Sequence, residues 1–266
     1  MPDEFTKTRV LITVMTYPLP SRNHLELVCT AGITDSNEWV RLYPIDYRYR
    51  PTGQKFHKYQ WVEIELAARG RGNDDRKESR KPNLDSIDPL GEPLSTRNNW
   101  RDRKRIIENL PINTINELKA LYEVDKTSLG IVRPSQIIDL KIEDASRDWK
   151  PEWQNLYDQL RLFGPTPKPL TKIPYKFSYV FECHDSETAH SAMIEDWELG
   201  VLYLKELNRL GNEGQAAENV KRKFFDEMCA PNKDTLFFMG TTFPFNSWVV
   251  LGVFWPQKDN QLTLNF

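Results

Sequence analysis

RVLITVMT, residues 9–16, is the stretch that decides the fold of the N-terminal half. It is rich in β-branched residues, which favour extended backbone, and three more stretches of this kind follow it. These stretches are residues 25–33, 39–43 and 59–66, and the polar clusters 18–23, 34–37 and 50–54 separate them. Four short strands with tight connections predict a small curled sheet, which we describe as a β-barrel-like module.

The sequence changes character at residue 69. RGRGNDDRKESRKPN, residues 69–83, contains two glycines and alternating charges but no apolar period. Pro89 and Pro93 follow, and the polar run NNWRDRKR, residues 98–105, is equally unpatterned. We therefore expect a long basic loop at about residues 69–105, of the kind that is either functional or disordered in compact domains.

Helical and strand patterns alternate beyond this loop. We expect helices over residues 113–123 and 152–162, with a strand over residues 136–142 between them. GPTPKPLTKIP, residues 164–174, holds four prolines and a glycine, which predicts a stiff connection. The predicted organisation is a module over residues 1–162, a linker at about residues 163–174 and a second module over residues 175–266.

The second module is expected to have an α+β fold. Residues 175–183 alternate as a strand, and the apolar spacing of residues 191–210 and 214–229 predicts two helices. Residues 235–239 and 248–255 are apolar at most positions, as in strands that are covered on both faces. The prediction is a helix pair packed on an antiparallel sheet.

Composition excludes several classes of protein. The chain has 266 residues, of which 39% are hydrophobic and 28% charged, which is typical of an ordered globular protein. No apolar run approaches the length of a membrane span, and the first ten residues lack the apolar core of a signal peptide. The three cysteines are far apart and form no CxxC pair. We therefore expect a cytoplasmic protein with no membrane partner and no disulfide framework.

Charge is unevenly distributed along the chain. The formal net charge is -2, but residues 41–105 hold 16 Lys and Arg against 10 Asp and Glu. Residues 182–236 hold the opposite excess, with 6 Lys and Arg against 12 Asp and Glu. A basic and an acidic segment create an oriented field that steers a polyanion to one face. The alternative is that both segments are ordinary solvated surface.

Cations and aromatic rings alternate in the basic segment. Nucleic acid uses both kinds of side chain, because Lys and Arg neutralise phosphates while rings stack on unpaired bases. The leading hypothesis is a non-catalytic protein that binds nucleic acid, RNA or single-stranded DNA, through residues 41–105. The alternative is that the rings are core and the arginines coat a rim. The candidate contact residues are Arg41, Tyr47, Arg48, Tyr49, Arg50, Lys55, Lys58, Arg69, Arg71, Arg101, Arg103 and Arg105.

A metal-dependent nuclease is the alternative of another class. Asp139 and Lys141 stand two apart on an apolar strand, and Asp88 lies upstream. Two carboxylates would hold a divalent metal, and the lysine would polarise the attacked phosphate. This is the only reading that requires a cofactor. A pair of solvent-facing side chains on a strand explains the same spacing.

The cysteines and histidines offer a weaker metal site. Cys183, His184 and His190 could ligate zinc, with Cys229 as a distant fourth ligand, but the alternation around Cys183 indicates a core thiol. Cys29 lies within an apolar strand and is expected to be structural and inert.

The C-terminal module offers two further surfaces. Lys221, Arg222 and Lys223 on its second helix would serve a winged-helix contact with DNA, although their acidic surroundings repel phosphate. Rings such as Phe245 and Trp248 could anchor a protein partner or a second copy of the chain. A protein-interaction subunit of a larger complex is therefore the third functional reading.

Overall fold

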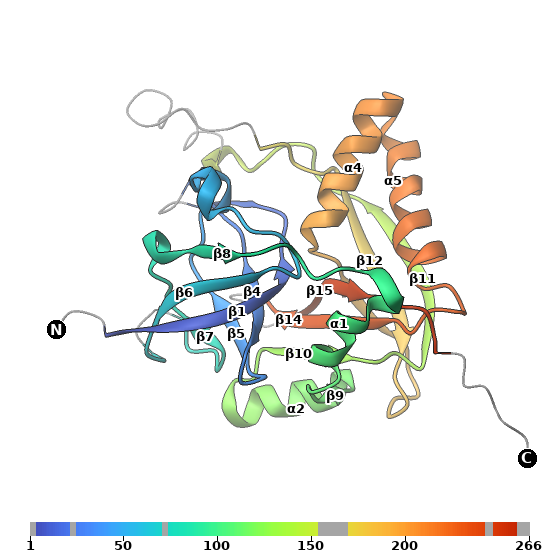
Figure 1. Cartoon of the computed structure of the whole chain (residues 1–266). Helices are drawn as coiled ribbons and strands as arrows, with labels where there is room; N and C mark the ends of the chain where they lie inside the picture. Colours follow the sequence, from blue (N-terminus) through green and yellow to red (C-terminus); the bar gives the residue numbers. More distant parts are fainter. Residues whose placement is uncertain (1–3, 22–24, 71–73, 154–169, 243–246, 260–266) are drawn as a thin grey trace, which may run out of the picture.

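The computed structural model describes residues 4–21, 25–70, 74–153, 170–242 and 247–259 (Figure 1). The described strands form four separate sheets, and helices are few. The mixed α and β class expected from the sequence is therefore confirmed. No helix in these ranges is long and apolar enough to cross a membrane.

The N-terminal half is built on a six-stranded sheet in the order β7-β5-β4-β1-β6-β8. β1 (Phe5–Met15) contains the RVLITVMT stretch and pairs antiparallel with β4 and β6. Val10–Met15 are all buried, because successive side chains point to opposite faces and both faces of β1 are covered. The other strands of this sheet are β4 (Thr30–Thr34), β5 (Trp39–Leu42), β6 (Trp61–Ala67), β7 (Ser79–Arg80) and β8 (Asp88–Leu90).

Short elements complete this half of the molecule. A two-stranded sheet and three single-turn 3₁₀ helices connect the longer strands. They are β2 (Leu19–Ser21), β3 (Leu25–Leu27), η1 (Tyr47–Tyr49), η2 (Thr52–Gln54) and η3 (Leu84–Ser86).

The N-terminal sheet bends, but no closed barrel is found among the strands that the structure describes. After β7 the chain turns back onto β6, where the Ala67 amide donates to Lys81 O at 2.9 Å. The Asn83 amide likewise donates to Glu65 O at 2.8 Å. The strand order nevertheless runs from β7 at one edge of the sheet to β8 at the other, so the barrel-like description is not confirmed.

The expectation of one long loop over residues 69–105 is wrong. Within the described part of this segment, the chain forms β7, η3, β8 and most of α1 (Arg97–Ile107). The helix is held by packing: Trp100, Ile106 and Ile107 lie against a core that includes Phe238 and Phe254. Apart from Trp100, only its last residues are apolar, so the local sequence gives little helical signal.

The C-terminal half, from β9 onward, contains two sheets and a helix pair. One sheet has the order β15-β14-β10-β9 and the other β11-β12-β13. Helices α4 and α5 lie together (Figure 1), and their buried residues share one core with the strands of both sheets. The elements are β9 (Ile112–Asn113), α2 (Ile115–Asp125), β10 (Leu129–Val132), β11 (Gln136–Asp144), β12 (Tyr175–Glu182), β13 (His190–Met193), α4 (Trp197–Leu210), α5 (Glu213–Lys221), the π-helix η4 (Arg222–Glu227), β14 (Leu236–Thr241) and β15 (Trp248–Phe254).

One expected helix differs in the structure, and another lies mostly outside its described residues. The helix expected over residues 191–210 begins only at Trp197, because Asp196 caps it by accepting from the Glu198 amide. The expected helix over residues 152–162 lies mostly outside the described residues. So does most of the linker at 163–174, and the two-module division stays a prediction.

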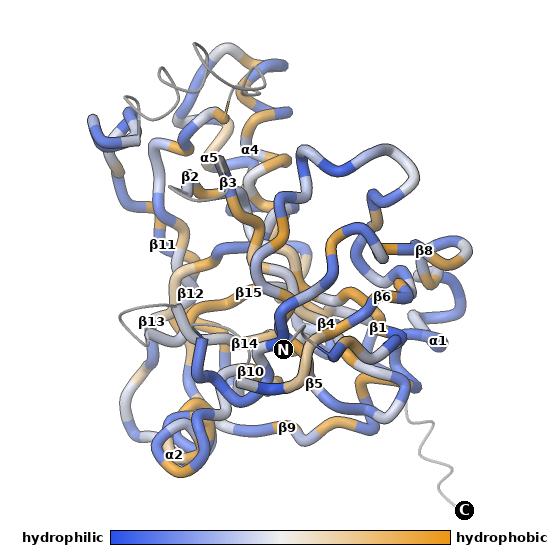
Figure 2. Tube along the Cα trace, turned by 90° about the vertical axis from the view of Figure 1, so that its left-hand side faces the viewer, coloured by the Kyte–Doolittle hydropathy of each residue, from blue (hydrophilic) through white to orange (hydrophobic). Residues whose placement is uncertain are grey.

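The two halves pack through a shared core. Val14, Ala31 and Ile33 of the N-terminal sheet pack with Phe238 and Leu251 of β14 and β15. In Figure 2 the strands at the middle of the molecule are largely orange and the outer turns largely blue, so hydrophobic residues concentrate where the halves meet. This contact brings α1 beside the helices of the C-terminal half.

Candidate functional site

Arg41, the first cation of the expected nucleic-acid face, is inside the protein. It is 1% exposed, and its guanidinium donates to Ser128 O at 3.0 Å and to Cys29 Sγ at 3.2 Å. Ser128 belongs to the C-terminal half, so Arg41 joins the halves. A side chain without solvent access cannot contact phosphate, and the expectation for Arg41 is corrected.

Three other cations of that face are bound to carboxylates. Lys58 Nζ lies 2.9 Å from Asp196 Oδ2, and the two side chains are 7% and 2% exposed. Burial alone would lower the pKa of Lys58, but the carboxylates of Asp196 and Glu198 outweigh it and raise that pKa. Arg48 pairs with Glu26 at 2.9 Å, and Arg50 pairs with Asp46 at 2.7 Å.

The remaining residues of that face are scattered. Tyr47 is partly buried, and its hydroxyl donates to Phe56 O at 2.6 Å, while Tyr49 is also only partly exposed. Lys55 and Arg69 are exposed, and Arg71 lies outside the described residues. The first part of the basic segment therefore forms no continuous cluster of unpaired cations and rings.

The last three predicted cations lie together on α1. Arg101 and Arg105 are exposed and four residues apart, so they share one face of the right-handed part of the helix. Arg103 points to another face and is half-buried. α1 is therefore the part of the predicted contact set that the fold presents as a unit.

The nuclease and zinc candidates are not brought into metal sites. Lys221 donates to Asp139 at 2.7 Å, and this hydrogen bond is the main cause that lowers the pKa of Asp139. Asp88 lies in a different sheet, on β8. Within the described ranges, no group of three His, Cys, Asp or Glu side chains could hold a metal ion.

The zinc candidates have separate environments. Cys183 is 2% exposed, and burial raises the pKa of its thiol. His184 is exposed, whereas burial lowers the pKa of His190, whose ring lies 5.6 Å from that of Phe181. These placements fit a core thiol and a histidine packed on an aromatic ring.

A cleft of about 530 Å³ lies where α1 meets the C-terminal helices. In Figure 1, α1 lies in front of β14 and β15 and below α4 and α5. The cleft is large enough for a small organic ligand. Its lining residues are Tyr59, Thr96, Trp100, Arg103, Glu198, Leu202, Glu206, Asn219, Arg222, Lys223, Phe224, Glu227, Met228, Val253 and Trp255.

Arg103 is the central cation of this cleft. Its guanidinium carbon lies 3.8 Å from the centre of the Tyr59 ring and 4.9 Å from that of Trp100. Its Nε donates to Leu94 O at 2.7 Å, and Glu198 interacts with it electrostatically without forming a described ion pair. Burial is the main cause that lowers the pKa of Arg103. The guanidinium is thus positioned on rings, with its outer nitrogens free of described partners.

The backbone at the cleft is unusual. Asn98, Asn99 and Trp100 at the start of α1 have φ values of 52°, 51° and 61°, which form a left-handed turn. Tyr59 is also left-handed, with φ 63°. Such conformations cost free energy for residues with a Cβ atom and concentrate at functional sites. They place the rings of Tyr59 and Trp100 together, 6.2 Å apart and edge to face.

The opposite wall is formed by α4, α5 and the π-helix. The π-helix contributes Arg222, Lys223 and Glu227, and the Met228 amide donates to Lys223 O at 3.2 Å, five residues back. Single π-helical turns are rare in proteins overall, and those that occur are often found at functional sites. Lys223 lies 4.8 Å from the centre of the Trp255 ring, so this wall repeats the combination of cation and ring.

The cleft is lined by three cations and three carboxylates. Glu206 pairs with Arg209 and Glu227 with Lys223, while Glu198 shares Lys58 with Asp196 and also interacts electrostatically with Arg103. Arg103 and Arg222 have no carboxylate partner among the described residues. The cleft therefore presents two guanidinium groups outside any described ion pair, and such groups can bind an anionic ligand through paired hydrogen bonds.

The Tyr59 hydroxyl is a further unsatisfied group of this cleft. Tyr59 is 5% exposed, and its hydroxyl oxygen has no hydrogen-bond partner within the described structure. Burial raises its pKa, so the phenol is a neutral donor and acceptor at pH 7. Buried polar groups normally have a partner, so this hydroxyl is an exception within the described structure.

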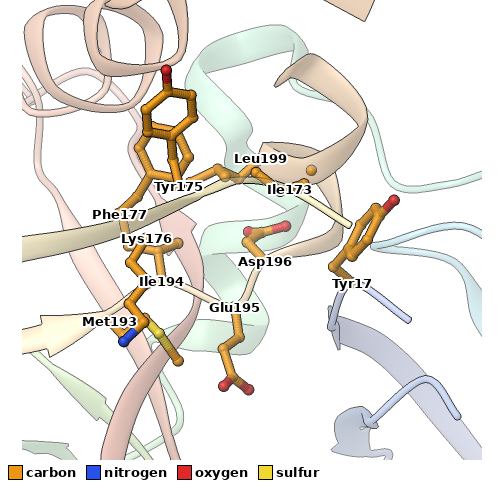
Figure 3. A pocket seen from close by; sticks show the side chains of 11 residues that line it. Tyr17, Ile173, Tyr175, Lys176, Phe177, Met193, Ile194, Glu195, Asp196 and Leu199 are labelled. Atoms are coloured by element: carbon orange, nitrogen blue, oxygen red, sulfur yellow. The ribbon is translucent and has the colours of Figure 1, made fainter. Parts of the chain in front are cut away.

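A second, smaller pocket lies beside β13 and α4 (Figure 3). It has a volume of about 80 Å³ and is lined by Tyr17, Glu195 and Asp196 among others. Figure 3 shows the two carboxylates pointing in different directions. Burial raises the pKa of Glu195, and Asp196 is bound to Lys58. The pocket is too small for a nucleotide, so the larger cleft is the better candidate.

Sequence reasoning identified single members of the cleft but not the set. Arg103 was expected to contact phosphate, and the basic run 221–223 was noticed on its helix. Two features of the sequence could have pointed to the cleft. The run 221–223 holds half the cations of the acidic segment 182–236, and two consecutive asparagines precede Trp100. Asparagine tolerates left-handed backbone better than most residues.

Two family models match the chain. Residues 111–265 match the model described as domain of unknown function (DUF8757), and residues 6–109 match domain of unknown function (DUF8758). No curated protein matches the chain. The cleft is formed where the two matched segments meet, since Tyr59, Trp100 and Arg103 come from one and the opposite wall from the other.

Proposed function

We propose a function for this chain, which belongs to the family described as domain of unknown function (DUF8757): it binds nucleic acid without cleaving it. An unpaired nucleotide enters the cleft between α1 and the π-helix. The observation that carries the proposal is Arg103. A half-buried guanidinium on two rings, without a described carboxylate partner, lacks the anion that would complete its hydrogen bonds.

The chemistry of the cleft matches the two parts of a nucleotide. The fork of a guanidinium binds phosphate through two parallel hydrogen bonds, and Arg103 and Arg222 supply two such forks. Trp100 and Trp255 line the same cleft, and stacking of a base on an aromatic ring contributes about 1–3 kcal/mol.

A strand of nucleic acid would continue along α1. Arg101 and Arg105 are exposed on that helix, beside the residues that line the cleft. Phosphates on either side of the bound nucleotide would contact them. Only an unpaired base can leave the stack and enter a cleft, which favours RNA or single-stranded DNA over duplex.

The test compares cleft cations with an exposed cation elsewhere. We expect Arg103→Ala and Arg222→Ala each to weaken binding of a labelled single-stranded oligonucleotide by about ten-fold, or 1.4 kcal/mol, in fluorescence anisotropy. Lys55→Ala is the matched control, because Lys55 is exposed on the N-terminal module and does not line the cleft. It should change the affinity less than two-fold.

Arg222 keeps the test independent of folding, since this side chain is exposed and makes no hydrogen bond or ion pair with a described residue. Affinity should also fall steeply as salt rises, and less steeply in the Arg103 variant. Binding that is absent, or that Lys55→Ala weakens as strongly as Arg222→Ala, would contradict the cleft as the site.

The other expectations stay proposals. The return of residues 81–83 onto β6 supports a barrel-like N-terminal sheet without closing it. A nuclease centred on Asp139 and Lys141, a protein-interaction subunit or homo-oligomer formed through the C-terminal module, and a cytoplasmic location remain predictions. None of them is favoured by a geometry comparable to that of the cleft.

A further inference from the structure

β11 is a long strand at the open edge of a sheet. It has 9 residues, and its only partner among the described strands is β12. Apart from β15, the other edge strands have between 2 and 4 residues, and β15 is covered where the Glu195 amide donates to Val250 O at 2.9 Å. Figure 1 shows β11 on the side of the C-terminal half that faces away from the N-terminal sheet. An open edge of this length presents a row of unpaired backbone groups to another strand.

The backbone groups of every second residue in β11 point away from β12. In an antiparallel pair, residues that exchange hydrogen bonds with the opposite strand alternate with residues that do not. The Ala145 amide donates to Pro174 O at 2.8 Å and continues the register of the two strands, so residues 141 and 143 also bond to β12. Residues 140, 142 and 144 therefore direct their N–H and C=O groups to the open edge.

The first half of this edge is closed by a side chain. The strand register shifts between Ile137 and Asp139, and the Asp139 carboxylate accepts from the Leu140 amide at 2.8 Å. Lys221 donates to the same carboxylate at 2.7 Å. Bulges and charged side chains protect an edge from pairing. The second half stays open: within the described structure, the Leu140 carbonyl and the outward groups of residues 142 and 144 have no partner.

Two opposite charges stand on this open half, one on each side of Ile142. Lys141 and Glu143 are exposed, and neither forms an ion pair with a described residue. Inside the sheet, Lys141 lies opposite Ser178 and Glu143 opposite Lys176. Ile142 is partly buried and packs against the core, on the other face of the strand. The open half therefore presents a cation, an apolar residue and an anion in sequence.

We propose that this edge binds a second copy of the chain, with the two β11 strands antiparallel about a two-fold axis at Ile142. Lys141 of each copy then lies opposite Glu143 of the other. The amides of Ile142 and Asp144 in each copy donate to the carbonyls of Ile142 and Leu140 in the other. The two sheets become one continuous sheet, and the Asp139 carboxylate keeps its contacts. This inference does not depend on the proposed binding of nucleic acid.

Charge selects this register among the neighbouring ones. An axis at Lys141 places two lysines opposite each other, and an axis at Glu143 places two glutamates there. An axis at Leu140 needs the amide that Asp139 already occupies. Opposite charges directly across an antiparallel pair are stabilising, and like charges are destabilising. With the axis at Ile142, the charged side chains also fall at the non-hydrogen-bonded positions, where opposing side chains are closest.

The first experiment measures self-association of the full chain by sedimentation velocity over a concentration series. We expect a reversible equilibrium between monomer and dimer. Lys141→Glu and Glu143→Lys each place like charges across the axis, so each should weaken the dimer by about ten-fold or more. Lys119→Glu is the matched control, because Lys119 is exposed on α2 and its reversal changes the net charge as Lys141→Glu does. It should change the dissociation constant less than two-fold.

The second experiment mixes the two variants. In a mixed dimer, the glutamates at positions 141 and 143 of one copy face the lysines at positions 143 and 141 of the other, so mixing Lys141→Glu with Glu143→Lys should restore the dimer. Mixing Lys119→Glu with Glu143→Lys should not. Loss of folding cannot produce this recovery, and far-UV circular dichroism of each variant should match that of wild type.

Three results would each overturn the proposal. Wild type that is monomeric at every soluble concentration shows that a second copy is not the occupant of this edge. A dimer that Lys141→Glu and Glu143→Lys leave intact is formed through another surface. A dimer that both variants weaken, but that their mixture does not restore, does not have the register centred on Ile142.

Discussion

Asp125 at the end of α2 connects the halves of the molecule through a single side chain. Lys77 of the N-terminal half and the hydroxyl of Thr127 donate to its carboxylate. The hydrogen bond from Lys77 is the main cause that lowers the pKa of Asp125 to about 2. A carboxylate with a depressed pKa adds stability that is present above about pH 4 and is lost as the pH falls toward 2.

Asp125→Asn should therefore lower the unfolding free energy at pH 7 by about 0.5 kcal/mol, the scale of a partly exposed ion pair screened by water. The difference from wild type should shrink as the pH falls from 4 to 2, when thermal unfolding is compared at several pH values. Asp144→Asn, an exposed aspartate at the end of β11, is the control. A difference that stays constant down to pH 2 contradicts this assignment.

Other single residues show why charge alone does not reveal a contact surface. Arg41 and Arg103 are both arginines of the basic segment, yet one is 1% exposed and the other lines a cleft. Arg41 is held by Ser128, and Arg103 lies on the ring of Tyr59. Neither partner is close to its arginine in the sequence. The sequence predicts the cation, and the fold assigns its partner.

At the scale of elements, α1 and α2 differ in how much local sequence specifies them. Thr114 and Glu117 form a capping box at the start of α2, and this helix was expected from its own residues. α1 instead begins with the left-handed turn of Asn98, Asn99 and Trp100. Asn99 is fixed from outside, because its side chain accepts from the Gln257 amide at 2.8 Å and donates to Gln257 O at 3.0 Å.

Asn98 tests the strain in this turn, since its side chain makes no hydrogen bond in the described structure. Asn98→Ala should destabilise the protein by about 1 kcal/mol in urea unfolding, because alanine tolerates positive φ less well than asparagine. Asn98→Gly should cost markedly less, since glycine adopts this conformation freely. Equal losses for the two variants would mean that backbone strain is not the cause.

At the scale of the whole molecule, a buried polar network joins the two halves. Arg76 donates to Thr241 O at 2.7 Å, and Glu78 accepts from the Ser128 amide at 3.0 Å. The apolar core beside this network also contains residues of both halves. Because neither half covers its own surface here, they should unfold together.

We expect one unfolding transition in urea, with coincident midpoints for tryptophan fluorescence and far-UV circular dichroism. Glu78→Ala should lower the free energy of unfolding by about 2–3 kcal/mol and shift both midpoints together, because it leaves the buried Ser128 amide without its acceptor. Two separated transitions, or a shift in one probe alone, would show that the halves unfold independently.

The sequence by itself determined the mixed α and β class, the position of the longer strands and the start of α2, because hydrophobic periodicity and capping act over a few neighbouring residues. It also marked α1 as rich in cations. The tertiary structure decided which cations are free: Lys58 meets Asp196 from 138 positions away, and Arg41 meets Ser128 from 87. Ion pairs and clefts depend on distances in space, and packing of the two halves sets those distances.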